Sequence, residues 1–125
     1  MRSMITAPPD TAPWLYLRVQ NKAIERVRLF VGGGIDPEDD NVDVEIDLAD
    51  GGVVTATFIT PRNIVTLLSR WKVSGEYGGG VALQIKDLVV LPDLSLASIR
   101  AALEAFGLAF GDLPTRPRSD PGPET

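Results

Sequence analysis

The segment VDVEIDL-ADGG-VVTATFIT restricts the fold more than any other feature. In its first half, apolar residues occupy every second position from Val42 to Leu48, with acidic residues between them. Side chains of a strand point alternately to opposite faces, so this run predicts a strand with one apolar and one acidic face. Residues 50–52 form a typical hairpin turn, because glycine readily adopts the positive φ that such turns need. Residues 53–60 are therefore expected to return as the antiparallel partner strand.

Period-2 patterns predict further strands on both sides of this hairpin. Residues 14–19 alternate, and so do residues 27–31, which place three apolar side chains on one face. A helix over residues 22–31 is the alternative, but these three side chains do not share a helical stripe. The apolar run over residues 81–91 predicts a further strand region, with a bulge or bend at its Lys-Asp pair.

Two helices are predicted from capping residues and apolar stripes. Thr60 suits the N-cap of the first helix, because its hydroxyl can accept a bond from a free amide, and Pro61 suits the first helical position. Gly75 is a natural end for this helix. The second helix begins after Asp93 or Ser95. The stripes, spaced by three and four residues, are Ile64, Leu67, Leu68 and Trp71 in the first helix and Leu96, Ile99, Leu103 and Phe106 in the second.

These elements together predict an α+β domain in the order β-β-β-β-α-β-α. We expect an antiparallel sheet of four or five strands with two helices packed on one face, giving two layers. A length of 125 residues suits one domain. Proline-rich polar ends at residues 1–12 and 112–125 are predicted to be disordered tails, because such segments bury too little apolar surface to offset the entropy of ordering. The folded domain is then expected at residues 13–111.

Missing residue types exclude much chemistry. The chain has no histidine and no cysteine, so it can form no disulfide, no thiolate zinc site and no Ser-His-Asp or Cys-His catalytic arrangement. We therefore predict that it is not an enzyme and uses no cofactor. Its net charge of 12 − 17 = −5 disfavours nucleic acid as a partner, because phosphates are neutralised by lysine and arginine. No signal peptide or membrane span is recognisable, so a cytoplasmic protein without a membrane partner is expected.

Three motifs resemble ligand sites, and each departs from the required pattern. The glycines at residues 32–34 follow a strand, but a proline and four carboxylates stand where a phosphate loop needs a helix N-terminus. The acidic residues from 36 to 47 partly match a calcium loop, yet an asparagine replaces the glycine of the sharp turn, and we predict no metal site. The glycines at residues 78–80 lead into a predicted strand. With Glu76 and Tyr77 they could shape a shallow pocket.

Charge is the strongest functional signal. Eight acidic residues and no basic residue lie between positions 36 and 50, and three of them share one face of the first hairpin strand. One interpretation is a solvated face, partly neutralised by Arg26 and Arg28 on a neighbouring strand. The other is a docking surface for a basic partner, since such patches raise encounter rates and suppress wrong partners. The predicted partner-binding residues are Asp36, Glu38, Asp39, Asp40, Asp43, Glu45, Asp47, Glu76 and Tyr77.

Residues 54 to about 106 also carry a recognisable pattern. The string ATFIT-P-RNI-x3-L is followed by SGEYGGG, an apolar strand and a short helix. This half of the chain resembles small bacterial proteins of uncharacterised function, and related small acidic proteins are often immunity partners of secreted toxins. The resemblance implies a non-catalytic protein, and it carries over no catalytic residue.

The leading hypothesis is a non-enzymatic interaction domain, of immunity or antitoxin type, that binds and neutralises a basic, toxin-like protein through its acidic residues. The alternative is a small-molecule-binding or regulatory domain that uses the loop at residues 75–80. An enzyme is the least favoured class, because both histidine and cysteine are missing. A homo-oligomer that pairs through a free sheet edge is a further hypothesis.

Overall fold

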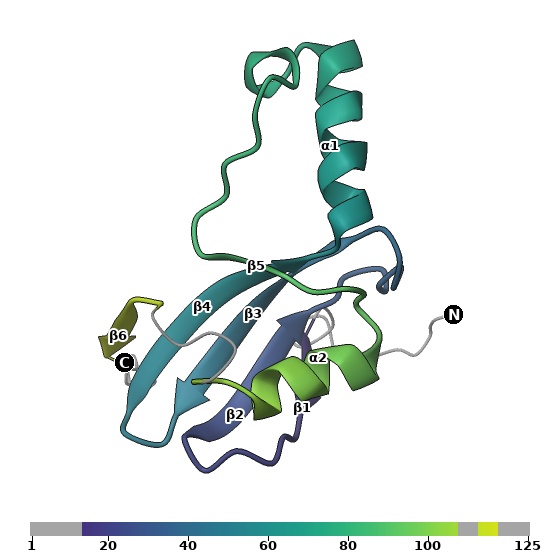
Figure 1. Cartoon of the computed structure of the whole chain (residues 1–125). Helices are drawn as coiled ribbons and strands as arrows, with labels where there is room; N and C mark the ends of the chain where they lie inside the picture. Colours follow the sequence, from purple (N-terminus) through teal and green to yellow (C-terminus); the bar gives the residue numbers. More distant parts are fainter. Residues whose placement is uncertain (1–13, 108–112, 118–125) are drawn as a thin grey trace.

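The structure, a computed structural model, describes residues 14–107 and 113–117. It contains an open sheet and two α-helices, so the predicted α+β class is confirmed (Figure 1). The predicted order of elements is also correct, with a strand added at the end. In chain order the elements are β1 (Trp14–Leu17), β2 (Ile24–Phe30), β3 (Asn41–Leu48), β4 (Gly52–Ile59), α1 (Pro61–Ser74), the 3-10 helix η1 (Tyr77–Gly79), β5 (Leu88–Val90), α2 (Leu96–Glu104) and β6 (Thr115–Pro117).

The first five strands lie side by side in chain order. The pairs from β1 to β4 are antiparallel, as predicted, whereas β5 runs parallel to β4. The parallel pairing follows from the connection, because α1 leads the chain away from the end of β4 and the segment after it brings the chain back before β5 begins (Figure 1). The helix alternative for residues 22–31 is wrong, since β2 occupies most of that range.

Strand β6 corrects the predicted domain boundary at residue 111. Its three residues fall in the stretch predicted to be a disordered tail, yet they pair antiparallel with Gly52, Val53 and Val54 at the start of β4. Two prolines flank or occupy this short strand, which is tolerated because β6 has only one described neighbour and needs few backbone donors. Residues 1–12, 112 and 118–125 of the predicted tails lie outside the described residues.

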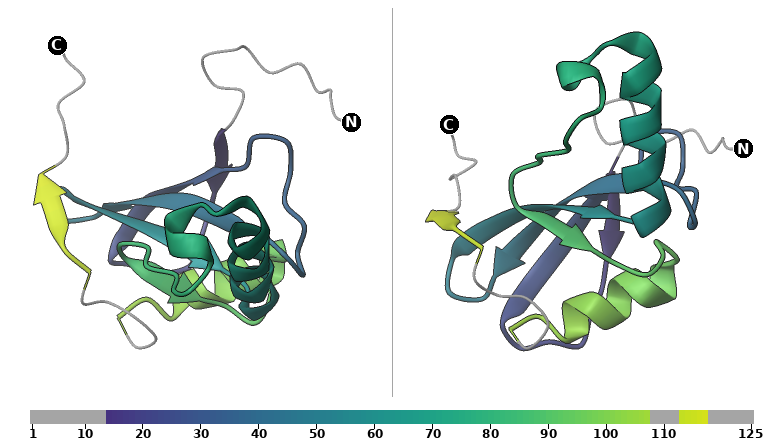
Figure 2. Two further views of the ribbon diagram at one scale, coloured as in Figure 1. Left: turned by 90° about the horizontal axis from the view of Figure 1, so that it is seen from above. Right: turned by 45° about the horizontal axis from the view of Figure 1, so that its top comes forward.

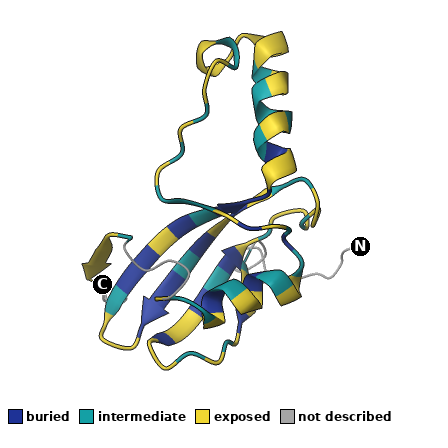
Figure 3. Cartoon of the chain, viewed as in Figure 1, coloured by how far each residue is buried: buried dark blue, intermediate teal, exposed yellow. Residues whose placement is uncertain are grey.

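The apolar core lies between the sheet and α2. Alternate side chains of β2, β3 and β4 point to this side, as the period-2 patterns predict. Ile99 and Leu103 of α2 are fully buried against them (Figure 3). Helix α2 is capped by Ser95, whose hydroxyl oxygen accepts a bond from the Ser98 amide at 3.1 Å, and this decides between the two predicted caps. Its apolar stripe therefore supplies one wall of the core.

Helix α1 forms as predicted, but it extends beyond the core. Thr60 accepts a bond from the Asn63 amide at 3.1 Å, and Gly75 ends the helix with a φ of 83°. Both helices lie on the same side of the sheet in the view from above (Figure 2). Of the two, only α2 contributes to the buried apolar cluster, because the one buried residue of α1 is Asn63. The stripe of α1 is only half-buried, and the helix rises past the end of the sheet (Figure 1).

Residues 81–85 do not form the predicted strand. The three glycines at residues 78–80 all have positive φ and reverse the chain at the tip of α1. A Cβ atom at Gly80 would overlap the carbonyl oxygen of Leu68, so the absence of a side chain there lets the returning segment lie against the helix. In this segment Ala82, Gln84 and Ile85 line a hollow with Trp71 of α1, whereas Val81 is exposed. The chain rejoins the sheet only at Leu88. We call residues 61–86 the arm.

Candidate functional site

The face of the sheet opposite α2, which we call the outer face, is the candidate site. No helix among the described residues lies over it (Figure 2). Strand register places its side chains in two rows that cross the sheet, each taking one residue from β1, β2, β3 and β4. The first row is Trp14, Phe30, Asp43 and Thr57, and the second is Tyr16, Arg28, Glu45 and Thr55.

Asp47 is on the predicted strand but is not accessible to a partner. Its side chain is 1% exposed and lies between two guanidinium groups. Arg28 Nη1 and Nη2 donate to its two carboxylate oxygens at 2.9 and 3.0 Å, and Arg26 Nε donates at 3.1 Å. Burial alone would raise the pKa of Asp47, but the bonds from Arg28 and Arg26 outweigh it and lower the pKa. Asp47 is therefore a structural anion, which corrects its assignment as a partner-binding residue.

Glu45 has an arginine beside each of its carboxylate oxygens. Arg28 Nη2 lies 2.7 Å from its Oε1, and Arg116 Nη2 lies 3.5 Å from its Oε2. The sequence predicts partial neutralisation by arginines of the neighbouring strand, but it does not point to Arg116, because that residue stands in a predicted tail. The Glu45 side chain remains 31% exposed, so it keeps some access to solvent while the arginines orient it.

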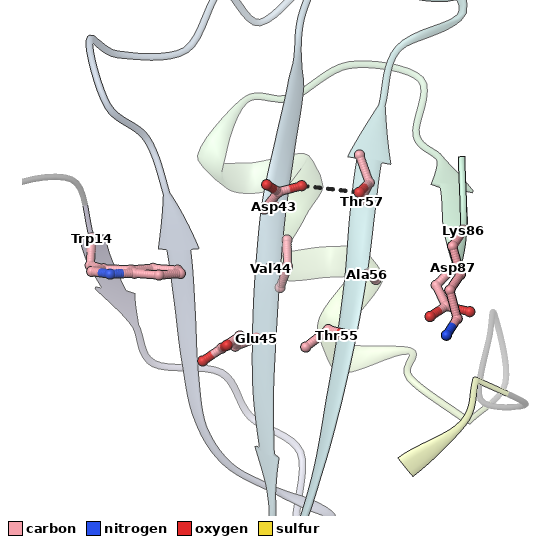
Figure 4. Close-up of a pocket in the computed structure, with 9 residues that line it drawn as sticks. All are labelled: Trp14, Asp43, Val44, Glu45, Thr55, Ala56, Thr57, Lys86 and Asp87. Carbon is pink, nitrogen blue, oxygen red and sulfur yellow. Dashed lines mark hydrogen bonds between the residues drawn. The ribbon is translucent and has the colours of Figure 1, made fainter. Parts of the chain in front are cut away.

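Asp43 is the accessible carboxylate of the three. It is exposed and accepts one bond, from the Thr57 hydroxyl at 3.0 Å. It lies on the floor of a hollow of about 330 Å³ that Trp14 bounds on one side and the Lys86–Asp87 turn on the other (Figure 4). Trp14 is held by an edge-to-face contact with Phe30, with ring centroids 5.4 Å apart. The hollow thus combines a fixed aromatic wall with an accessible carboxylate.

The acidic loop at residues 36–40 uses part of its charge within its own fold. Asp40 Oδ2 accepts from the Asp36 amide at 2.9 Å. Asp39 accepts from Asn63 Nδ2 at 2.8 Å and Thr66 Oγ1 at 2.7 Å, which ties the loop to the first turns of α1.

These two bonds lower the pKa of the Asp39 carboxyl. Asp36 and Glu38 remain exposed at the rim of the loop. Of the loop residues predicted to bind a partner, these two are the ones whose carboxylates the structure leaves facing solvent.

The two predicted residues of the glycine loop, Glu76 and Tyr77, make different contacts. Tyr77 lines a hollow of about 410 Å³ together with Trp71, Ala82, Gln84 and Ile85. Its ring contacts that of Trp71, with centroids 4.5 Å apart. Glu76 accepts a bond from the Ser74 hydroxyl at 3.0 Å and does not line this hollow. Trp71, which the stripe suggests to be core, is instead half-buried in the arm.

The described part of the chain contains no cluster of side chains that could hold a metal ion. No three carboxylates there are arranged as a metal site. The residues that match a calcium loop are divided between the loop and the strand, where Asp47 is neutralised by arginines. Nor is any helix of the described residues long and apolar enough to cross a membrane.

Comparisons with known proteins do not assign this chain to a family. No protein-family model, curated protein or solved structure matches this chain. The resemblance to small bacterial proteins and the immunity-protein hypothesis therefore stay predictions, and function has to be argued from the geometry of the chain itself.

Proposed function

We propose that this chain is a non-enzymatic protein-interaction domain that binds a basic protein through its outer face. The observation that carries the proposal is the placement of Asp43, an exposed carboxylate on the floor of an aromatic-walled hollow that no described helix covers. Exposed aromatic residues beside a fixed polar group are typical of the energetic centres of protein interfaces.

The chemistry of the hollow suits a lysine or arginine side chain of the partner. Such a cation would pair with Asp43 and lie against the ring of Trp14, and both interactions strengthen when water is excluded. Tyr16 shows a related arrangement within the chain, since the Arg26 guanidinium lies 5.9 Å from its ring centroid. Asp36 and Glu38 would act at longer range by attracting a basic partner.

The Arg28 network supports this surface indirectly. Because Arg28 bonds to both Glu45 and Asp47, it fixes the Arg28–Glu45 pair of the second row before a partner arrives. A surface that is already ordered loses less conformational entropy on binding. An immunity or antitoxin role in the cytoplasm is the specific form of this proposal, and it is supported by the acidic charge and by the absence of histidine and cysteine.

The test is a titration of the ¹⁵N-labelled full chain with an arginine-rich octapeptide. We expect shifts to concentrate at Trp14, Asp43 and Thr57, and we expect Asp43→Lys to weaken binding about tenfold or more, because it removes an ion pair and adds a like charge. Glu104→Lys is the matched control, since it makes the same charge change on α2, behind the sheet. Equal loss in both variants would mean that net charge alone drives binding, and the proposed site would be wrong.

The arm hollow favours a second candidate function, the binding of an apolar small molecule. Its volume of about 410 Å³ is within the range of ligand sites, and Trp71 and Tyr77 give it an aromatic lining. A fluorescent apolar probe, 8-anilinonaphthalene-1-sulfonate, should quench Trp71 saturably in a Trp14→Phe background. Binding that survives Tyr77→Ser and Ile85→Ser together would exclude this hollow.

A further inference from the structure

We propose that the arm joins two copies of this chain, with the outward face of α1 packed antiparallel against the same face of α1 in the second copy. This inference is independent of the proposed function, because the outward face of α1 is separate from the outer face of the sheet. Its starting point is two valines on a projecting helix: Val65 is 63% exposed and Val73 is 90% exposed. Covering apolar side chains in such a position with a second surface is favourable, because it removes them from water.

The two valines and Ser69 form a single row on the helix. Their spacing of four residues places them on one face, opposite the stripe that lies toward residues 81–86. Rows of this spacing are the ridges by which helices most often pack, at crossing angles near −50°. The small side chain of Ser69 at the middle of the row permits close approach of the two backbones.

A two-fold axis at Ser69 makes this row complementary to itself. Residues equally far before and after Ser69 then face each other, so Val65 of one copy meets Val73 of the other, and the reverse contact forms as well. A two-fold arrangement closes, so it yields a dimer and not a filament. This register uses both exposed valines of α1, and it places Ser69 of one copy opposite Ser69 of the other.

The charges of the arm favour the same antiparallel register, and they favour a second copy of this chain as the partner. Arg62 lies in the first turn of α1 and Glu76 follows its C-cap Gly75, so antiparallel pairing brings the start of each helix, with Arg62, toward the end of the other, with Glu76. A parallel pairing would instead set Arg62 against Arg62 and Glu76 against Glu76. The Glu76 carboxylate stays close to the end of the helix, because it accepts a bond from the Ser74 hydroxyl at 3.0 Å.

The base of the arm supplies a second complementary pair. Lys72 lies three positions after Ser69 and would face Thr66 of the second copy. Thr66 donates its hydroxyl to Asp39, so the lysine would approach the acidic loop at residues 36–40. The lysine near the tip of one arm therefore meets the acidic base of the other, which is charge complementarity that a second copy provides without any other protein.

Sedimentation equilibrium of the full chain tests the proposal. The wild type should be a concentration-dependent dimer, and Val73→Asp should weaken dimerisation by about 100-fold or more, because a charge would enter the apolar contact. Val81→Asp is the matched control, since Val81 is 84% exposed on the arm but lies off α1. A wild type that stays monomeric up to millimolar concentration, or a Val73→Asp variant that dimerises normally, would overturn the proposal.

A charge swap tests the register without altering the apolar row. Arg62→Glu and Glu76→Arg should each weaken the dimer about fivefold, and the double variant should restore it, because each ion pair is then reversed. Circular dichroism should show unchanged helix content in all three variants. A double variant weaker than either single one would contradict the antiparallel register. Asp43→Lys should leave the dimer unchanged, which separates this test from that of the proposed function.

Discussion

Helices α1 and α2 look alike in the sequence and have different roles in the structure. Each begins after a hydroxyl cap and carries one apolar stripe. In α2 the stripe residues Ile99 and Leu103 are fully buried against the sheet, whereas no stripe residue of α1 is buried. An apolar stripe therefore predicts a helix with a covered side, but it does not predict how completely that side is covered or by which element.

The difference arises from how each helix is attached. Helix α2 lies across the sheet, so its stripe meets the apolar side chains of β2, β3 and β4. Helix α1 starts where β4 ends and runs about 21 Å at 1.5 Å per residue, past the end of the strands. Its base is fastened by polar groups instead: Asn63 and Thr66 donate to Asp39, and Asn41 donates to Asn63. The described residues outside the arm, which we call the body, are thus held mainly by apolar packing. The arm is joined to the body by hydrogen bonds.

The largest difference between the two regions should appear on truncation of leucines. Leu103→Ala is expected to lower the free energy of unfolding by about 2–5 kcal/mol, because it leaves a cavity in the core. Leu68→Ala, a matched change in the half-buried stripe of α1, should cost roughly 1 kcal/mol, since less surface is lost and the arm can adjust. Urea unfolding followed by circular dichroism measures both. Equal losses would show that the arm is packed as tightly as the core.

A smaller effect is expected from the buried ion network. Asp47→Asn should lower stability at pH 7 by about 2 kcal/mol, because Arg28 and Arg26 lose a buried anionic partner while Arg28 keeps Glu45. The folded-state pKa of Asp47 is lowered below its unfolded value near 3.9. Its stabilisation is therefore full above about pH 4 and is lost as the pH falls through the folded-state pKa.

The effect of Asp47→Asn on stability should depend on pH, because it acts through a buried ion pair. The difference between wild type and Asp47→Asn in urea unfolding should shrink as the pH is lowered from about 5 to about 2. If Asp47→Asn matched the wild type at pH 7, the buried network would not be a stabilising part of the body.

Asp39→Asn, which removes the charged acceptor at the base of the arm, should reduce helix content more than it reduces global stability.

Local patterns account for the parts of the fold that the sequence predicts correctly. The β3–β4 hairpin follows from alternation and an Asp-Gly-Gly turn, and the ends of α1 follow from Thr60 and Gly75. These features depend on neighbours a few residues apart. The strand prediction fails at residues 81–85 because alternation does not show whether a neighbouring strand is present. This segment returns along the arm and pairs with β4 only from Leu88. Strand β6 escapes prediction because its three residues, one of them a proline, are too few to show a periodicity.

The candidate site is predictable only in part, for the same reason. Alternation places Asp43, Glu45 and Asp47 on one strand face, and all three are there. It does not show that Asp47 is buried between two arginines while Asp43 stays exposed, because that depends on which cross-strand neighbour each one meets. Arg28 lies between Glu45 and Asp47, whereas Asp43 has Phe30 and Thr57 beside it. The accessible part of the acidic face is therefore narrower than the sequence suggests.

The most direct test of this two-part molecule is residue-resolved amide hydrogen exchange of the full chain. It should be carried out at a concentration at which ultracentrifugation shows a monomer. Amides in the last two turns of α1 should open with a lower free energy than those of β2, β3, β4 and α2, which should exchange together near the global value. If the α1 amides instead exchange at the same free energy as the strands and α2, the arm belongs to the core, and the division of the molecule into body and arm is wrong.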